Sequence, residues 1–191
     1  MQPFLIANDI PLFYKYLDKA THYFEFGSGG STYQAAQRSA IQSITSVESD
    51  LEWHNKLKRA ITDTSRINFI YNYMDTRPNN WGRPGPKSTK ADWISYSNHI
   101  TKDLDLAKKL DFILIDGRFR VACCLKSFDI ISDSCLIAFD DFLNRKEYHV
   151  VLDYYDIKDK SVDNRMVILK KKSDCLPPSK ELIGKYEIIM D

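Results

Sequence analysis

The sequence predicts one α/β domain with a mostly parallel β-sheet and helices on both faces. Short apolar runs without polar alternation recur along the chain, as expected for strands that are buried on both sides. Stretches with helical spacing separate these runs, which is the pattern of a parallel sheet wound with helices. A length of 191 residues suits a single core, so we expect residues 1–191 to form one domain.

The elements are expected in the following order. Residues 1–20 read as a helical lead-in that Pro11 interrupts. Five strands are expected at residues 23–26, 44–47, 67–71, 112–115 and 135–139. Helices are expected at residues 31–40, 50–61 and 146–155, and one begins near Arg118. Residues 166–169 predict a further strand, in an antiparallel hairpin with residues near Ile157. The tail, residues 173–191, ends in a helix or a strand.

One interval breaks this alternation. Residues 76–98 are polar, contain proline and glycine, and carry Trp81, Trp93 and Tyr96. Loops this long inside compact domains are usually functional or disordered. The aromatic side chains argue against disorder because they need a surface to pack on. We therefore expect residues 76–98 to form a lid or substrate loop.

Composition limits the class of partner. The chain has 27 Lys plus Arg and 26 Asp plus Glu, a net charge of +1, which gives no reason to expect nucleic acid or an anionic membrane as a partner. No apolar run reaches the ~20 residues of a membrane helix. The first residues lack the pattern of a signal peptide. The four cysteines lack the paired spacing of a zinc site. We expect a cytoplasmic protein with a small-molecule or glycan partner, and a homodimer is left open.

A glycine turn follows the first expected strand, at residues 25–32 (Glu-Phe-Gly-Ser-Gly-Gly-Ser-Thr). Glycines let the backbone turn sharply and approach a ligand, and Ser31 or Thr32 can cap the next helix. Thr32 stands where the dinucleotide fingerprint G-x-G-x-x-G needs its third glycine. Glu25 would repel a pyrophosphate and attract a cation. The turn therefore suits S-adenosylmethionine, which has an ammonium, a sulfonium and no phosphate, better than it suits NAD.

A second carboxylate supports a nucleoside ligand. Glu48 ends the second expected strand, roughly 20 residues past the turn, where it can accept hydrogen bonds from both ribose hydroxyls. Asp75 follows the third strand and could reach the adenine or the loop. The residues expected to bind the cofactor are Glu25, Gly27, Ser28, Gly29, Ser31, Thr32, Glu48 and Asp75.

On these motifs the chain resembles the class I S-adenosylmethionine-dependent methyltransferases. Residues 24–32 are similar to the acidic glycine motif of that superfamily, and residues 46–48 are similar to its ribose-binding acid. The resemblance covers residues 21–172. It implies a Rossmann-like class I methyltransferase fold with a seven-stranded sheet, and transfer of a methyl group from S-adenosylmethionine.

A narrower resemblance lies in the second half of the chain. Residues 115–117 and 138–142 are similar to metal-dependent sugar O-methyltransferases of the macrocin O-methyltransferase type. In those enzymes an acid after strand four and an acid pair after strand five hold a divalent ion. The metal ligands that the resemblance implies are Asp116, Asp140 and Asp141, with Mg²⁺ or Mn²⁺ bound. Arg118 and Phe119 stand where those enzymes carry the catalytic base, so the base does not carry over.

The chemistry of hydroxyl methylation suggests further roles. A sugar hydroxyl needs a base or a cation that lowers its pKa. The three aspartates follow strands that end at one crevice and supply the oxygen ligands of a hard cation. His149 is a candidate general base, although a histidine at such a place is commonly a packing residue. Arg118 and Arg120 suit an anionic acceptor or pairing with the aspartates equally well.

These inferences combine into one expected function. We expect an O-methyltransferase that acts on a hydroxyl of a sugar or glycan, with a divalent metal assisting. The expected catalytic residues are Asp116, Asp141 and His149, and the expected acceptor contacts are Trp81, Trp93, Tyr96, Arg118 and Tyr148. The alternatives are a nicotinamide-dependent oxidoreductase, which Thr32 disfavours, a cofactor-binding module without catalysis, and a methyltransferase for a phenolic or protein acceptor.

Overall fold

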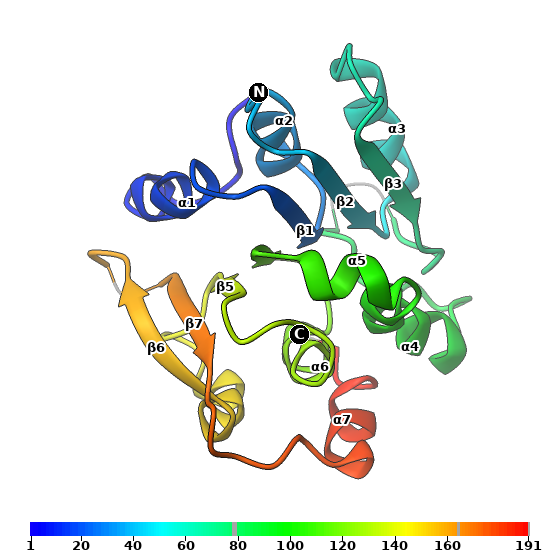
Figure 1. The fold of residues 1–191 in the computed structure, drawn as a ribbon. Coiled ribbons are helices and arrows are strands. Elements are labelled where there is room, and N and C mark those ends of the chain that lie inside the picture. Colours follow the sequence, from blue (N-terminus) through cyan, green and yellow to red (C-terminus); the bar gives the residue numbers. More distant parts are fainter. Residues whose placement is uncertain (78–79, 164, 191) are drawn as a thin grey trace.

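The computed structural model describes residues 1–77, 80–163 and 165–190. Within these residues the strands form one seven-stranded sheet in the order β3-β2-β1-β4-β5-β7-β6 (Figure 1). The strands are β1 (His22–Phe26), β2 (Ser43–Glu48), β3 (Ile67–Tyr71), β4 (Phe112–Ile115), β5 (Leu136–Phe139), β6 (Tyr155–Lys160) and β7 (Val167–Lys171). Parts of the expected loop (78–79) and tail (191) lie outside the described residues. No described helix is long and apolar enough to span a membrane.

The sheet is parallel except at one edge. Strands β2 and β4 flank β1 in parallel, and β3 and β5 extend the parallel part on either side. Strand β7 runs antiparallel to β5 and β6, and Ile157 pairs with Leu169 in this hairpin, as predicted. The strand order reverses between β1 and β4. In open α/β sheets a ligand crevice forms at this point, outside the carboxyl ends of the strands.

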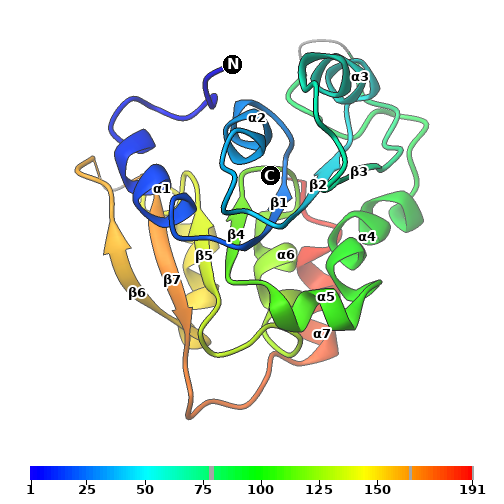
Figure 2. The same cartoon turned by 45° about the horizontal axis from the view of Figure 1, so that its top comes forward.

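Helices cover both faces of the sheet (Figure 2). Helices α1 (Ile10–Leu17) and α2 (Gly30–Ala36) pack over one face with Tyr23 and Phe112. Helices α4 (Lys90–Asn98) and α6 (Arg120–Ser127) pack over the other face with Phe24 and Phe26. Successive strand residues point to opposite faces, which explains why β1 is buried without polar alternation. The other helices are α3 (Leu51–Ala60), η1 (His99–Thr101), α5 (Leu104–Lys109), η2 (Lys146–Asp153) and α7 (Lys180–Tyr186).

The predicted helical lead-in was wrong in its extent. Helix α1 begins only at Ile10, and Pro11 stands in its first turn. A backbone N–H in the first turn has no partner within the helix, so proline costs nothing there. Pro11 therefore starts the helix and does not interrupt it.

The predicted loop at residues 76–98 is shorter than expected, because its last nine residues form helix α4. Thr89 and Asp92 exchange side-chain and backbone hydrogen bonds at 2.7 and 3.3 Å, which forms a capping box. The helix turns Tyr96 into the core, where it is 1% exposed. Trp93 is half-buried and packs against Phe119, with ring centroids 6.1 Å apart.

Candidate active site

The glycine turn lies at the point where the strand order reverses. Gly27 has a φ of +95°, and a Cβ there would lie 2.7 Å from the backbone nitrogen of Gly117. The chain that leaves β1 therefore passes against the chain that leaves β4, and only glycine fits this approach. The Gly27 N–H donates to the Val47 carbonyl at 2.9 Å, which ties the turn to β2 as well.

The structure does not support the predicted contact of Glu25 with the cofactor, because hydroxyl groups of the protein surround its carboxylate. Its carboxylate is 0% exposed. The hydroxyls of Tyr23, Ser31 and Ser46 donate to it at 2.9, 2.7 and 2.7 Å, and the Thr32 hydroxyl donates as well. Burial raises the pKa of Glu25, and these hydrogen bonds oppose the rise. Glu25 holds β1, β2 and the start of α2 together.

Thr32 helps to cap α2, as predicted, but it does so from the third helical position and not as the N-cap residue. Helix α2 begins one residue earlier, at Gly30, with Gly29 before it. The Gly29 N–H donates to the Thr32 hydroxyl at 2.9 Å, and Ser31 is turned towards Glu25. A Cβ on Gly30 would collide with the Gln2 carbonyl, so the N-terminal segment packs on the first turn of α2.

Glu48 ends β2 next to the glycine turn, where it was predicted. Its carboxylate accepts backbone hydrogen bonds from Ser28 at 3.0 Å, Ser49 at 2.7 Å and Asp50 at 2.8 Å. Burial raises the pKa of Glu48 to about 7, against the effect of these donors. Glu48 is therefore fixed relative to the turn by backbone groups on both sides of it.

A loop covers Glu48. A Cβ on Gly82 would lie 3.7 Å from a carboxylate oxygen of Glu48, and the Ser49 hydroxyl donates to the Gly82 carbonyl at 3.1 Å. Glu48 is 6% exposed. A ribose can reach this carboxylate only if the chain around Gly82 moves away.

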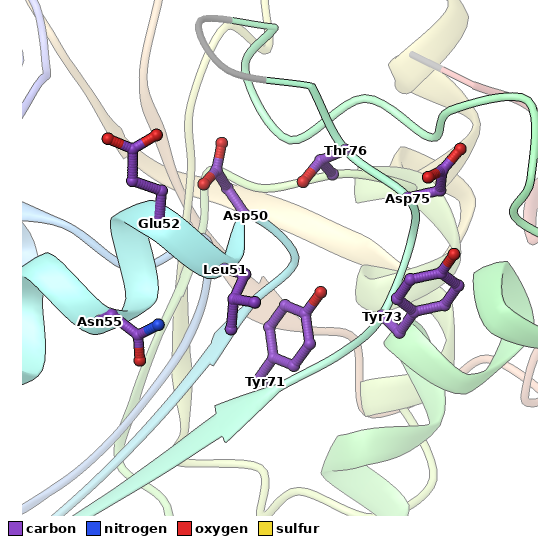
Figure 3. Close-up of a pocket in the computed structure, with 8 residues that line it drawn as sticks. All are labelled: Asp50, Leu51, Glu52, Asn55, Tyr71, Tyr73, Asp75 and Thr76. Carbon is purple, nitrogen blue, oxygen red and sulfur yellow. The ribbon is translucent and has the colours of Figure 1, made fainter.

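A pocket of about 430 Å³ lies next to this loop, at the edge strand β3. Figure 3 shows its side chains coming from the start of α3 and from the chain that leaves β3. The lining residues are Asp50, Leu51, Glu52, Asn55, Tyr71, Tyr73, Asp75 and Thr76. The register of β2 and β3 pairs Glu48 with Tyr71, which places the pocket beside the predicted ribose acid. Three carboxylates and two phenols favour a cationic ligand over an anionic one.

Asp75, predicted to bind the cofactor, lines this pocket, whereas its other seven lining residues were not predicted. Asp50 also caps α3, where its carboxylate accepts from the Trp53 N–H at 3.0 Å. The Trp53 indole N–H donates to the Ser28 carbonyl at 2.7 Å and so supports the glycine turn. The predicted helix at residues 50–61 begins with Asp50 and could have indicated this cap. Nothing in the sequence pattern places Trp53 on the turn.

The three aspartates predicted to bind metal do meet at the carboxyl ends of β4 and β5, but they surround an arginine. Arg120 lies 3.0 Å from Asp116, 3.5 Å from Asp140 and 3.6 Å from Asp141, measured between guanidinium nitrogens and carboxylate oxygens. Asp141 also pairs with Arg145 at 2.9 Å and with Arg165. Among the described residues, no cluster of three histidines, cysteines, aspartates or glutamates is arranged to hold a metal ion. The structure therefore does not support the predicted metal site, because arginine side chains already pair with all three carboxylates.

Arg118 belongs to the same buried group. It is 8% exposed, and burial raises the pKa of Asp116 while the charges of Arg120 and Arg118 oppose that rise. For Arg120, pairing with the aspartates is the alternative that the structure supports. Asp116 keeps more exposure than its neighbours, 25% of its side chain against 9% for Asp140 and 12% for Asp141.

Most of the side chains that were predicted to contact the acceptor are packed into the protein core. Tyr148 is 1% exposed and packs on Phe139, and its hydroxyl accepts from Arg145 at 2.7 Å, so its predicted contact with an acceptor was wrong. Tyr96 is equally buried, and Trp93 packs on the core. Trp81 alone among the predicted aromatics is open, at 67% exposure, with its ring 5.1 Å from that of Phe4.

His149 stays a prediction as the general base. One ring nitrogen lies 3.2 Å from the Phe142 carbonyl, and its ring packs on Phe142 at 5.2 Å. These contacts tie the histidine to the segment after β5, but they do not join it to an aspartate.

Solved structures of methyltransferases share this architecture, although no protein-family model and no curated protein matches the chain. A methyltransferase-like protein from Silicibacter pomeroyi is 23% identical, with 97% of this chain and 96% of that chain covered and a TM-score of 0.82. A candidate caffeoyl-CoA O-methyltransferase from Staphylococcus aureus is 15% identical, with 90% and 86% covered and a TM-score of 0.59.

An RNA methyltransferase from Salinibacter ruber, solved with S-adenosylhomocysteine, is 13% identical, with 88% of this chain and 95% of that chain covered and a TM-score of 0.52. At these identities the likeness shows the fold. The chain therefore has the α/β fold of the class I methyltransferases, as the resemblance in its motifs predicted.

Proposed function

We propose that this chain binds S-adenosylmethionine and transfers its methyl group to a hydroxyl of an acceptor. The observation that carries the proposal is the hydrogen bond between Glu48 and Ser28. It joins the acid at the end of β2 to the glycine turn after β1. The turn lies at the reversal of strand order, and Glu48 ends the neighbouring strand β2, in a fold shared with methyltransferases.

The charge of the neighbouring pocket supports this cofactor over a dinucleotide. None of the eight lining residues is basic, and Asp50, Glu52 and Asp75 are acidic. A pyrophosphate would meet carboxylates there, whereas an ammonium or sulfonium would be attracted. The phenol rings of Tyr71 and Tyr73 add aromatic surface that favours a cationic nucleoside.

The acceptor is proposed to bind in the crevice outside the carboxyl ends of β1, β4 and β5. S-adenosylmethionine supplies an electrophilic methyl group when it is bound, and the chain must orient the acceptor oxygen towards it. Asp116 is the most exposed of the three aspartates there and can accept a hydrogen bond from the acceptor hydroxyl. A sugar or glycan remains the proposed acceptor, and Trp81 is the exposed ring on which a sugar could stack.

Calorimetric titration tests the cofactor. We expect S-adenosylmethionine and S-adenosylhomocysteine to bind the wild type and NAD to show no heat of binding. Glu48→Gln should weaken binding by about tenfold or more, because a buried ligand contact of about 1.4 kcal/mol or more is lost. Glu181→Gln, an exposed carboxylate on α7, is the matched control and should bind as the wild type does. Binding of NAD, or of neither sulfur compound at millimolar concentration, would refute the proposal.

A further inference from the structure

We propose that the Arg120 guanidinium takes the place of a divalent cation between the ends of β4 and β5, so that the chain needs no metal there. Arg120 is then a positioning residue that fixes the aspartates of the acceptor crevice. The inference extends the proposed function, but its test measures metal binding and does not depend on methyl transfer.

The oxygens around Arg120 form the donor set of a hard cation. Its side chain donates to the carbonyls of Gly117 at 3.0 Å, Asp140 at 2.8 Å and Asp116 at 3.2 Å. It also pairs with the carboxylates of Asp116, Asp140 and Asp141 at 3.0 to 3.6 Å. Carbonyl and carboxylate oxygens in this mixture are the ligands that Ca²⁺ and Mg²⁺ take in proteins.

Charge and burial both disfavour the binding of a metal ion beside Arg120. The Arg120 side chain is 5% exposed, and a buried charge is tolerated only when it is paired and hydrogen-bonded. Asp141 is also paired with Arg145 and Arg165. A divalent ion added to this group would be repelled by three guanidinium groups at short range.

The local backbone explains how Arg120 reaches this place. Arg120 is the first residue of α6, and Phe119 before it has a φ of +52°, a region that non-glycine residues seldom adopt. The Phe119 ring is 1% exposed and packs near Trp93 and Tyr96, which holds this conformation in place. The sharp turn lets the side chain fold back over Gly117 and Asp116, three and four residues earlier.

The replacement changes how an acceptor would be held. Mg²⁺ keeps exchangeable waters that a substrate oxygen can displace. Every nitrogen of the Arg120 guanidinium instead contacts an oxygen of the protein. The acceptor would therefore be oriented by Asp116 and not by direct contact with the cation.

Metal titrations of the purified chain test the inference. For the wild type we expect no bound Mn²⁺ by electron paramagnetic resonance, and a melting temperature that Mg²⁺, Mn²⁺, Ca²⁺ and EDTA leave within about 1 °C. Arg120→Ala removes the cation and leaves the oxygens, so it should melt lower. Millimolar divalent ion should then raise its melting temperature by about 3 °C or more, and EDTA should reverse the rise.

Two further variants separate a cation site from a general effect. Arg120→Ala combined with Asp140→Asn should lose most of the metal response. Arg38→Ala breaks the ion pair with Asp18 far from the crevice, and it should show no metal response.

Two results would overturn the inference: micromolar Mn²⁺ binding by the wild type that Asp140→Asn abolishes, or an Arg120→Ala chain that folds and ignores metal. If Arg120→Ala does not fold, the wild-type titration decides alone. Failure to bind S-adenosylmethionine would overturn the proposed function and leave these metal results standing.

Discussion

The role of Glu25 gives a quantitative prediction. Glu25→Ala removes the buried carboxylate that accepts from the hydroxyls of Tyr23, Ser31, Thr32 and Ser46. A buried polar group without a partner costs about 1–3 kcal/mol. The Thr32 and Ser46 hydroxyls lie 3.3 Å apart and can pair with each other, so we count two lost partners and not four. We expect a loss of about 4 kcal/mol, a large part of the 5–15 kcal/mol that stabilises a typical domain.

Urea unfolding followed by tryptophan fluorescence measures this loss. Glu25→Gln keeps the shape and one acceptor oxygen, so it should cost about 1–2 kcal/mol. Because Glu25 contacts no ligand in this account, Glu25→Gln should bind S-adenosylhomocysteine as the wild type does. A Glu25→Ala chain within about 1 kcal/mol of the wild type would refute the reasoning, and so would a stable Glu25→Gln chain that no longer binds the cofactor.

Three further predictions concern residues at the carboxyl ends of the parallel strands. Burial raises the pKa of Glu48 from 4.5 to about 7, so the folded chain holds this proton more tightly than the unfolded chain. The free energy of unfolding of the wild type, relative to that of Glu48→Gln, should therefore fall as the pH rises from about 4.5 to 7. Urea unfolding measures this difference, and midpoints of the two proteins that differ equally at pH 5 and pH 8 would contradict the prediction. Gly117→Ala should lower the free energy of unfolding by about 1–3 kcal/mol, because its Cβ would collide with the Tyr96 hydroxyl. Adding Tyr96→Phe to this variant should recover part of the loss in thermal melts. If it recovers nothing, the collision with the hydroxyl is not the cause. Ser49→Ala removes the hydrogen bond to the Gly82 carbonyl that holds this loop beside Glu48. Association of S-adenosylhomocysteine should then speed up by about 2- to 10-fold in stopped-flow measurements, whereas an unchanged rate would mean that the loop does not limit entry.

The central parallel strands could be predicted because consecutive residues in each of them are buried. The run Phe112–Ile115 has no polar residue, and all of it is buried. Strand β7 begins with three buried residues of the same kind, and it pairs with β6 as predicted, with Ile157 opposite Leu169. The class I fold then followed from the order of these strands and the motifs that end β1 and β2.

Helix α4 was missed although the sequence carried a sign of it. Thr89 and Asp92 have the three-residue spacing of a capping box, but the prolines and glycines before them favoured a loop. The direction of the Glu25 side chain could also have been predicted in part from the sequence. Successive side chains of a strand point to opposite faces of the sheet, so Glu25 lies on the same face as Tyr23, which is the face that α2 covers.

The partners of the aspartates could not be predicted from spacing. Asp141 pairs with Arg165, which lies 24 residues further along the chain and reaches it only because β7 returns beside β5. The resemblance to metal-dependent enzymes rests on the acids alone, and the acids are indeed together. Whether a metal or an arginine lies among them depends on side chains that fold in from three different segments.

Amide hydrogen exchange with S-adenosylhomocysteine tests the central claim most directly, because it reports both the ligand and its place. The account predicts slower exchange at residues 26–32, 48–53 and 71–76, which are the glycine turn, the Glu48 segment and the chain that leaves β3. NAD at the same concentration should change nothing. Protection by NAD, or protection by S-adenosylhomocysteine confined to other parts of the chain, would contradict a cofactor site at this edge of the sheet.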